Sequence, residues 1–127
     1  DREDIASRAA ELYPEQSISW FWLGELANTG PDRFLAAFYF ERSMLLNPSD
    51  GLAWCRLGRI YEGQEMFEDS FQAYAQCCQN GDPGSHGCFG AGRLSEKLGN
   101  IPMAIEYYQR SHHEPALDRA EELEAEQ

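Results

Sequence analysis

WCRLGRIY, residues 54–61, is the stretch that decides the fold of this chain. It places Trp54, Leu57, Gly58 and Tyr61 three, four and seven residues apart, which puts them on one face of a helix. A glycine inside a helix costs about 1 kcal/mol relative to alanine, so it usually marks the close approach of another backbone. The stretch therefore predicts one half of a packed pair of helices.

The same pattern recurs with a period of 34 residues, both before and after this stretch. It divides the chain into three contiguous units, 17–50, 51–84 and 85–118, with one helix predicted in 1–16 and another in 116–127. The residues that carry the pattern are Trp20, Leu23, Gly24, Ala36, Phe40, Pro48, Trp54, Leu57, Gly58, Tyr61, Tyr74, Gly92, Ala104 and Tyr108.

This order of residues resembles the tetratricopeptide repeat, whose signature is Trp-x2-Leu-Gly-x2-Tyr, then Ala-x3-Phe, then Pro, at a period of 34. The resemblance covers nearly the whole chain. It implies an all-α fold, an α-solenoid of antiparallel helix pairs stacked in a right-handed superhelix. We expect 1–16 to be the second helix of a preceding repeat in a longer array, or else an N-terminal cap. We expect 116–127 to be a capping helix, or the truncated first helix of another repeat.

The 127 residues are enough for one domain, and their net charge is -12. Such an acidic chain repels phosphate backbones, so nucleic acid is not an expected partner. No apolar run approaches the length of a membrane span, so no membrane insertion is expected. The start, DREDIAS, shows no signal peptide, and we predict a cytoplasmic location.

The four cysteines show no CxxC spacing. We expect them to be small buried thiols in a reducing compartment, and we expect no cofactor. The alternative is a zinc site made by Cys77, Cys78, His86 and Cys88, which lie within twelve residues. Adjacent cysteines on a helix point about 100° apart, which makes convergence on one metal ion difficult.

The resemblance also implies a function and a place for it. In this family the first helices of successive repeats line a concave groove that holds a peptide or a helix of another protein. The expected function is therefore that of a protein–protein interaction scaffold or adaptor. The groove positions, carried over residue by residue, are Ile18, Phe21, Glu25, Asn28, Thr29, Leu52, Cys55, Arg59, Glu62, Gly63, His86, Phe89, Arg93, Glu96 and Lys97, with Arg56 nearby.

Two kinds of residue in this groove suggest what the ligand carries. Arg59 and Arg93 occupy the same position in consecutive repeats and could bind a carboxylate with paired hydrogen bonds. Phe21 and Phe89 are candidate apolar anchors. The alternative for the arginines is that they pair with acidic residues of neighbouring helices, at Glu25, Glu62 or Glu96.

One branch of the family clamps the acidic C-terminal tail of heat-shock chaperones with lysine, asparagine and arginine side chains. The chain does not carry that set, and a glutamate among the matching positions would repel a carboxylate. We therefore do not expect chaperone tails as partners. The matching positions here hold Phe21, Glu25, Arg56, His86 and Gly90.

A second surface is predicted on the apolar helix in residues 32–46. Leu35, Phe38 and Leu45 lie on the side away from the repeat signature. They are either buried against the neighbouring helix or form a convex patch for self-association, as in a structural module. We expect no enzyme activity, because the sequence has no phosphate-binding loop with a following lysine and no HExxH motif.

Overall fold

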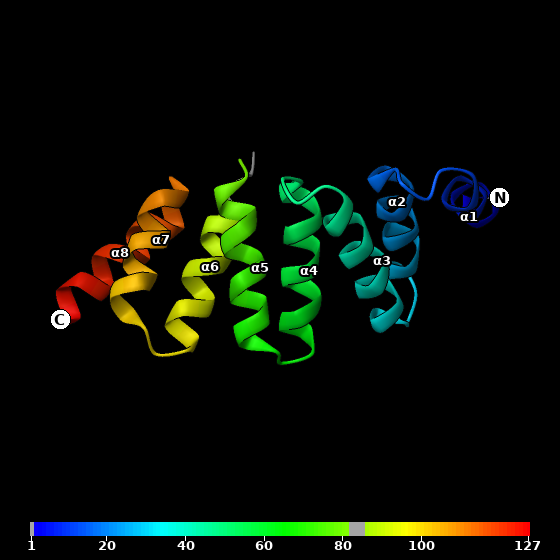
Figure 1. Cartoon of the computed structure of the whole chain (residues 1–127). Helices are drawn as coiled ribbons and strands as arrows, with labels where there is room; N and C mark the ends of the chain where they lie inside the picture. The colour runs from blue at the N-terminus through cyan, green and yellow to red at the C-terminus, as the bar shows by residue number, and fades with distance from the viewer. Residues whose placement is uncertain (1, 82–85) are drawn as a thin grey trace.

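The computed structural model describes residues 2–81 and 86–127, with side chains from residue 4 onward. These residues form eight α-helices and no strand, which confirms the predicted all-α solenoid of stacked helices. In Figure 1 the helices follow one another along a single row, with the two ends of the chain at opposite ends of the row. The helices are α1 (Arg2–Leu12), α2 (Ser17–Asn28), α3 (Arg33–Leu46), α4 (Gly51–Gly63), α5 (Phe67–Gln79), α6 (His86–Lys97), α7 (Ile101–Ser111) and α8 (Glu114–Glu126).

Short polar side chains start several of these helices. The carboxylate of Asp32 accepts a hydrogen bond from the backbone N–H of Leu35 at the start of α3, and Asp50 does the same at the start of α4. Asn100 caps α7 in the same way. Each cap satisfies a backbone donor that the first turn leaves unpaired, which stabilises a helix by about 1 kcal/mol.

In the first two repeats, the tryptophan of the signature joins the first helix to the turn before it by a hydrogen bond. The indole N–H of Trp54 donates to the carbonyl oxygen of Pro48 at 2.8 Å, and that of Trp20 donates to Pro14 at 2.8 Å. The identical separation of six residues explains why tryptophan and proline recur together. The third repeat has Cys88 at this position.

The glycines of the signature lie where two helices touch. A Cβ atom on Gly58 would stand 2.9 Å from the ring of Tyr74 on α5, and one on Gly24 would stand 2.7 Å from the ring of Phe40 on α3. Gly92 meets Tyr108 on α7 in the same way. Any side chain at these positions would push the aromatic ring away, so the glycine sets the distance between the helices of each pair.

The cysteines do not remain thiols, and the prediction of buried thiols is wrong. Cys55 on α4 is bonded to Cys77 on α5, and Cys78 on α5 is bonded to Cys88 on α6. The Cα atoms of the two pairs are 5.2 and 4.5 Å apart, which is within the range of ordinary disulfides. The neighbouring cysteines of α5 are bonded to different helices, so α5 is joined to the helix before it and to the helix after it.

The same geometry overturns the zinc alternative. All three cysteines of the proposed site, Cys77, Cys78 and Cys88, are engaged in disulfides and have no thiolate to offer a metal ion. His86 lies exposed at the start of α6. Across the part of the chain that the structure describes, no group of three or more histidine, cysteine or acidic side chains is placed to hold a metal ion.

The last helix departs from the period of 34. A first helix one period after α6 would start near residue 120, but α8 begins at Glu114, because only His112 and His113 separate it from α7. His112 adopts a left-handed backbone conformation with φ of 57°, which makes this turn tight. The predicted boundary between the second and third units, at residues 84 and 85, lies outside the described residues.

None of the helices in the described residues is long and apolar enough to cross a bilayer.

Candidate functional site

A groove of about 310 Å³ lies between α4, α5 and α6. We call it the central groove. Eight of its nine lining residues were predicted to face a ligand, and they come from two consecutive repeats. Tyr74 is the ninth, and the sequence had indicated only a structural role for it. The lining residues are Leu52, Cys55, Arg56, Arg59, Glu62, Tyr74, His86, Phe89 and Arg93.

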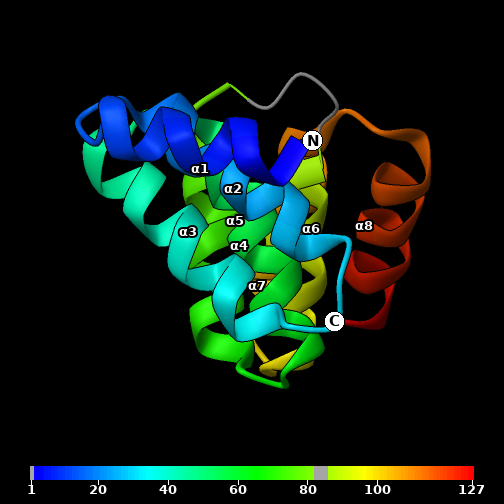
Figure 2. The ribbon, with the colours of Figure 1, turned by 90° about the vertical axis from the view of Figure 1, so that its right-hand side faces the viewer.

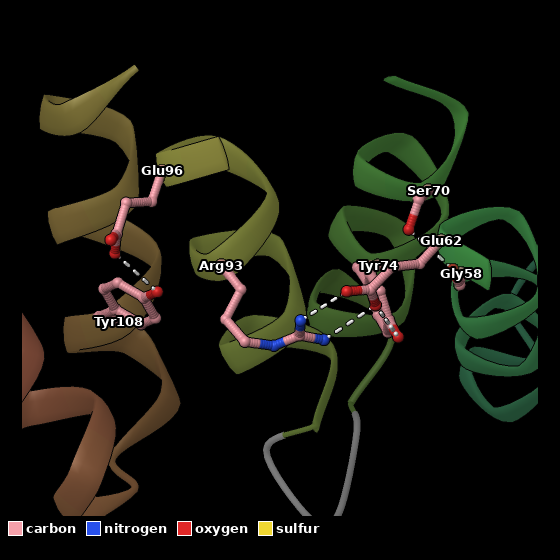
Figure 3. Close-up of polar contacts among 7 residues, drawn as sticks. All are labelled: Gly58, Glu62, Ser70, Tyr74, Arg93, Glu96 and Tyr108. Atoms are coloured by element: carbon pink, nitrogen blue, oxygen red, sulfur yellow. Dashed lines mark hydrogen bonds and ion pairs between the residues drawn. The ribbon is translucent and has the colours of Figure 1, made fainter. Parts of the chain in front are cut away.

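The floor of the central groove is a bonded set of three side chains from three helices (Figure 3). Arg93 holds Glu62 through two hydrogen bonds, of 2.6 and 3.0 Å, and the hydroxyl of Tyr74 donates to the same carboxylate at 3.2 Å. The hydrogen bonds from Arg93 lower the pKa of the Glu62 carboxyl, and those with Glu62 raise the pKa of Arg93. For Arg93, this pairing within the chain was one of the two alternatives left open by the sequence.

The arrangement repeats one period further along. The hydroxyl of Tyr108 donates to Glu96 at 3.1 Å, as Figure 3 shows, and Arg119 of α8 holds the same carboxylate at 2.6 Å. Hydrogen bonds from Arg119 lower the pKa of the Glu96 carboxyl. The repeat pattern did not indicate Arg119, because α8 starts earlier than the period predicts.

A third ion pair joins the first helices of the first two repeats. Arg56 of α4 contacts Glu25 of α2 at 2.7 Å, with about a quarter of each side chain exposed. The successive first helices α2, α4, α6 and α8 are therefore connected by one arginine–glutamate pair at each step. Arg56 and Arg93 are therefore each paired with a carboxylate of the chain itself.

Arg59 differs from the other arginines of the central groove. It is exposed, and it makes no ion pair with any residue that the structure describes. Arg93, one period later, pairs with Glu62; the residue one period before Glu62 is Asn28, which carries no charge. The side-chain oxygen of Asn28 is buried and has no hydrogen-bond partner among the described residues. The first repeat thus lacks the carboxylate that neutralises the equivalent arginine in the next repeat.

The second repeat of the chain is similar to a known repeat family. Residues 52–80 match the family model of the tetratricopeptide repeat, a span that covers most of α4 and all of α5. This stretch is a tetratricopeptide repeat. Proteins built from this repeat generally mediate protein–protein interactions. No curated protein matches the sequence significantly.

Several solved structures share the fold. YrrB, described as a tetratricopeptide-repeat protein with an unusual peptide-binding site, superposes with a TM-score of 0.75 at 20% identity, over 84% of this chain and 55% of YrrB. The N-terminal domain of stress-induced protein-1 from C. elegans gives 0.74 at 18% identity, over 85% of this chain and 94% of that domain. MamA gives 0.75 at 17% identity, over 98% of this chain and 64% of MamA. The chain therefore spans little more than half the length of YrrB.

Some of the predicted groove residues do not face the central groove. Phe21 is only 7% exposed, because its ring packs against Phe40 with the ring centres 5.5 Å apart. It belongs to the core and cannot serve as an apolar anchor. Phe89 is partly buried against Tyr108 but lines the groove. The ammonium of Lys97 lies 4.4 Å from the centre of the Phe67 ring.

The predicted patch on α3 is exposed. Leu35, Phe38 and Leu45 have 41%, 55% and 68% of their surface accessible, and Phe34 and Leu46 beside them are exposed as well. Burial against a neighbouring helix, the first of the two alternatives, is therefore wrong for these three residues. We refer to the five side chains together as the α3 patch.

Proposed function

We propose that the central groove binds a carboxylate-bearing segment of a partner protein, with Arg59 as the residue that takes the carboxylate. The observation that carries this proposal is that the guanidinium of Arg59 has no acidic partner among the described residues, whereas Arg56 and Arg93 in the same groove are each paired with a glutamate. Its planar fork of donors matches a carboxylate in a bidentate geometry. The partner's carboxylate would do for Arg59 what Glu62 does for Arg93.

The rest of the groove fits a peptide with an apolar side chain next to its acidic group. Leu52 is 49% exposed at one rim, and the partly buried ring of Phe89 lies in the same groove. The bonded set of Glu62, Tyr74 and Arg93 keeps the floor rigid, so little conformational entropy is lost when a ligand binds. The chain would then act as an adaptor that presents this groove.

The test uses peptides selected from a random library on the immobilised protein. Each selected peptide is labelled, and its Kd is measured by fluorescence anisotropy with wild type and with Arg59→Glu. We expect Arg59→Glu to weaken binding at least about ten-fold, because a hydrogen bond to a charged group contributes about 1.5–3 kcal/mol. A second form of each peptide has its acidic side chain replaced by the corresponding amide. This change should weaken binding to wild type by a similar factor, and it should have little effect on the Kd for Arg59→Glu.

The matched control is Arg110→Glu. Arg110 is an exposed arginine of α7 outside the groove, and its reversal changes the net charge by the same amount. Equal losses in the two variants would mean that only the overall charge of the protein matters, and the assignment of Arg59 would be wrong.

We propose self-association through the α3 patch as a second function. A comparison between repeats favours it. Phe34, Leu35 and Phe38 are exposed and apolar, whereas the equivalent residues of the second repeat are polar: Glu68, Asp69 and Gln72. The fold does not need apolar side chains there. The mass in solution is measured over a dilution series for wild type and Phe38→Gln. A wild-type mass that stays monomeric at every concentration would rule out this function.

We also infer that the chain resides in an oxidising compartment and not in the predicted cytoplasm. Two disulfides join three successive helices, and structural disulfides persist where thiols are not kept reduced. Titration of free thiols in the protein denatured without reductant checks this inference. We expect none of the four cysteines to react when the protein is taken directly from its source.

A further inference from the structure

The exposed face of α3 has a regular order of side chains along the helix. In Figure 2, α3 lies along the left border of the molecule and α8 along the right border. Two apolar residues, Phe34 and Leu35, begin this face, and two more, Leu45 and Leu46, end it. All four are between 41% and 76% exposed, and Phe38 between them is 55% exposed. The α3 patch thus consists of two apolar pairs with a phenylalanine between them.

Arg42 completes this face. It follows Phe38 by four residues, so the two side chains are neighbours on the surface of the helix. Arg42 is exposed, and it makes no ion pair with any residue that the structure describes. Its guanidinium lies over the Trp20 ring, 5.4 Å from the ring centre. The exposed side of this cation is therefore open to a second aromatic ring.

Two copies of this face are complementary when they run antiparallel. A two-fold axis beside residue 40 places residues of the two copies opposite each other when they are equally far from it in opposite directions. Phe38 is two residues before this position, and Arg42 is two residues after it. The phenylalanine of each copy therefore faces the arginine of the other copy, and the contact occurs twice.

The apolar pairs match in the same arrangement. Phe34 and Leu35 are six and five residues before residue 40, and Leu45 and Leu46 are five and six residues after it. Each residue turns an α-helix by about 100°, so Phe34 and Leu45 lie about 20° apart around the helix, and so do Leu35 and Leu46. Phe34 of one copy therefore meets Leu45 of the other, and Leu35 meets Leu46.

Charge favours a second copy as the occupant of this face. The chain has a net charge of -12, and two acidic surfaces of it would repel each other. Segment 32–46 has no net charge, because its charged residues are Asp32, Arg33, Glu41 and Arg42. Two copies can approach each other here without that repulsion, whereas a strongly acidic or basic partner finds little attraction.

From these observations, we propose that two copies of the chain pair antiparallel through α3, with a two-fold axis beside residue 40. The ring of Phe38 in each copy lies against the guanidinium of Arg42 in the other. This arrangement rests on the self-association proposed above, and it adds the orientation of the two copies and a binding role for Arg42.

A photo-cross-linker at residue 34 reports the orientation. p-Benzoylphenylalanine replaces Phe34 in the whole chain, and the cross-linked dimer is reduced and digested with trypsin, which releases segments 34–42 and 43–56. We expect the cross-link to join residue 34 to segment 43–56, which contains Leu45. Within one copy, Leu45 lies about 16 Å further along the helix, so this product forms only between copies.

The matched control for the cross-link is residue 68. Glu68 occupies the position of Phe34 in the second repeat and is exposed on α5. The same cross-linker placed there should give no cross-linked dimer.

Arg42→Gln tests the contact with the phenylalanine ring. We expect the Kd of the dimer, measured from the mass in solution over a dilution series, to rise at least about five-fold, because two contacts between a cation and a ring are lost. The control is Arg110→Gln, which should leave this Kd unchanged. Arg110 occupies the position of Arg42 in the third repeat, is exposed, and lies 5.3 Å from the centre of the Tyr107 ring. The helical circular dichroism of each variant shows that it is folded.

The possible failures are distinguishable. A cross-link from residue 34 to segment 34–42 of the other copy would identify a parallel pair, and a cross-link to any other segment would identify a different surface. Either result, or a Kd that Arg42→Gln leaves unchanged, would overturn the antiparallel arrangement and leave self-association itself in place. A wild-type mass that stays monomeric at every concentration would overturn both.

Discussion

At the scale of single residues, the fold depends on pairs in which one member must be small. Gly58 faces the ring of Tyr74, and the separation between α4 and α5 follows from that contact. Gly63, five residues later on the same helix, has nothing within 4 Å of the place where its Cβ would be. One helix thus holds a glycine that packing requires and a glycine that packing does not require.

We predict opposite effects for the two alanine substitutions in this helix. Gly58→Ala should lower the free energy of unfolding by about 1–3 kcal/mol, because the Tyr74 ring must move. Gly63→Ala should raise it by roughly 0.5–1 kcal/mol through the lower helix propensity of glycine. Urea denaturation measures both, and a destabilisation of the same size at the two positions would contradict the packing argument.

Glu62 gives a prediction about pH. Its pKa in the folded chain lies below the ordinary value of 4.5, mainly because Arg93 hydrogen-bonds the carboxylate. A lowered folded pKa stabilises the fold above pH 4.5, and the stabilisation is lost as the pH falls through the folded pKa. The free energy of unfolding of wild type should therefore exceed that of Glu62→Gln by about 1 kcal/mol at neutral pH. This difference should shrink as the pH falls below 4.5. A difference that stays constant down to pH 3 would show that the ion pair is not its cause.

The first disulfide could have been predicted from the sequence, although we expected free thiols there. In a pair of antiparallel helices, a residue a few positions before a contact on one helix lies near the residue the same number of positions after that contact on the other. Gly58 of α4 contacts Tyr74 of α5. Cys55 is three residues before Gly58 and Cys77 is three residues after Tyr74, so the two cysteines lie close together. The unpaired state of Arg59 was harder to predict, because Arg56 and not Arg59 takes up the charge of Glu25.

At the scale of the elements, α5 is the helix that the disulfides hold in place. The equivalents of Cys55 in the other repeats are Phe21 and Phe89, whose rings pack against the second helix of the same pair. Cys88 stands where Trp20 and Trp54 hold the preceding turn by a hydrogen bond. In the middle of the array, both disulfides therefore stand in positions where the other repeats use non-covalent contacts.

We predict that α5 loses stability when either disulfide is removed. The bonds span 22 and 10 residues, and loop-closure entropy gives about 3 kcal/mol for each. The double substitution Cys55→Ala/Cys77→Ala should lower the urea concentration at the midpoint of unfolding relative to wild type. Adding a reductant should lower this midpoint more for wild type, which loses two disulfides, than for the variant, which loses one. If reductant leaves the midpoint of wild type unchanged, the disulfides do not contribute to its stability.

The glycine-rich helix α6 depends on its neighbours for packing. Gly87, Gly90 and Gly92 are all buried against other helices. A Cβ on Gly87 would lie 2.5 Å from the backbone nitrogen of Cys78. The position of α8 was less predictable, because its early start depends on a two-residue turn that the period of 34 does not encode.

At the scale of the whole molecule, the two ends of the array differ in character. The exposed side of α8 is acidic, whereas Ile18 and Trp22, on the helix next to α1, are apolar and exposed. Hydrophobic periodicity identified the fold, since every repeat follows the same rule. It could not single out Arg59 among the arginines of the central groove, because the difference arises where one repeat departs from the rule: Asn28 stands where the second repeat has Glu62.

Binding of partners in the central groove through Arg59 can be tested directly in an extract of the source. A photo-cross-linking amino acid is placed at Leu52, on the groove rim, or at Phe38, on the α3 patch, and the captured proteins are identified. We predict a partner that cross-links from Leu52, does not cross-link from Phe38, and is lost when Arg59→Glu is added. Capture from Phe38 alone, or capture from Leu52 that Arg59→Glu does not change, would contradict the proposed role of the groove.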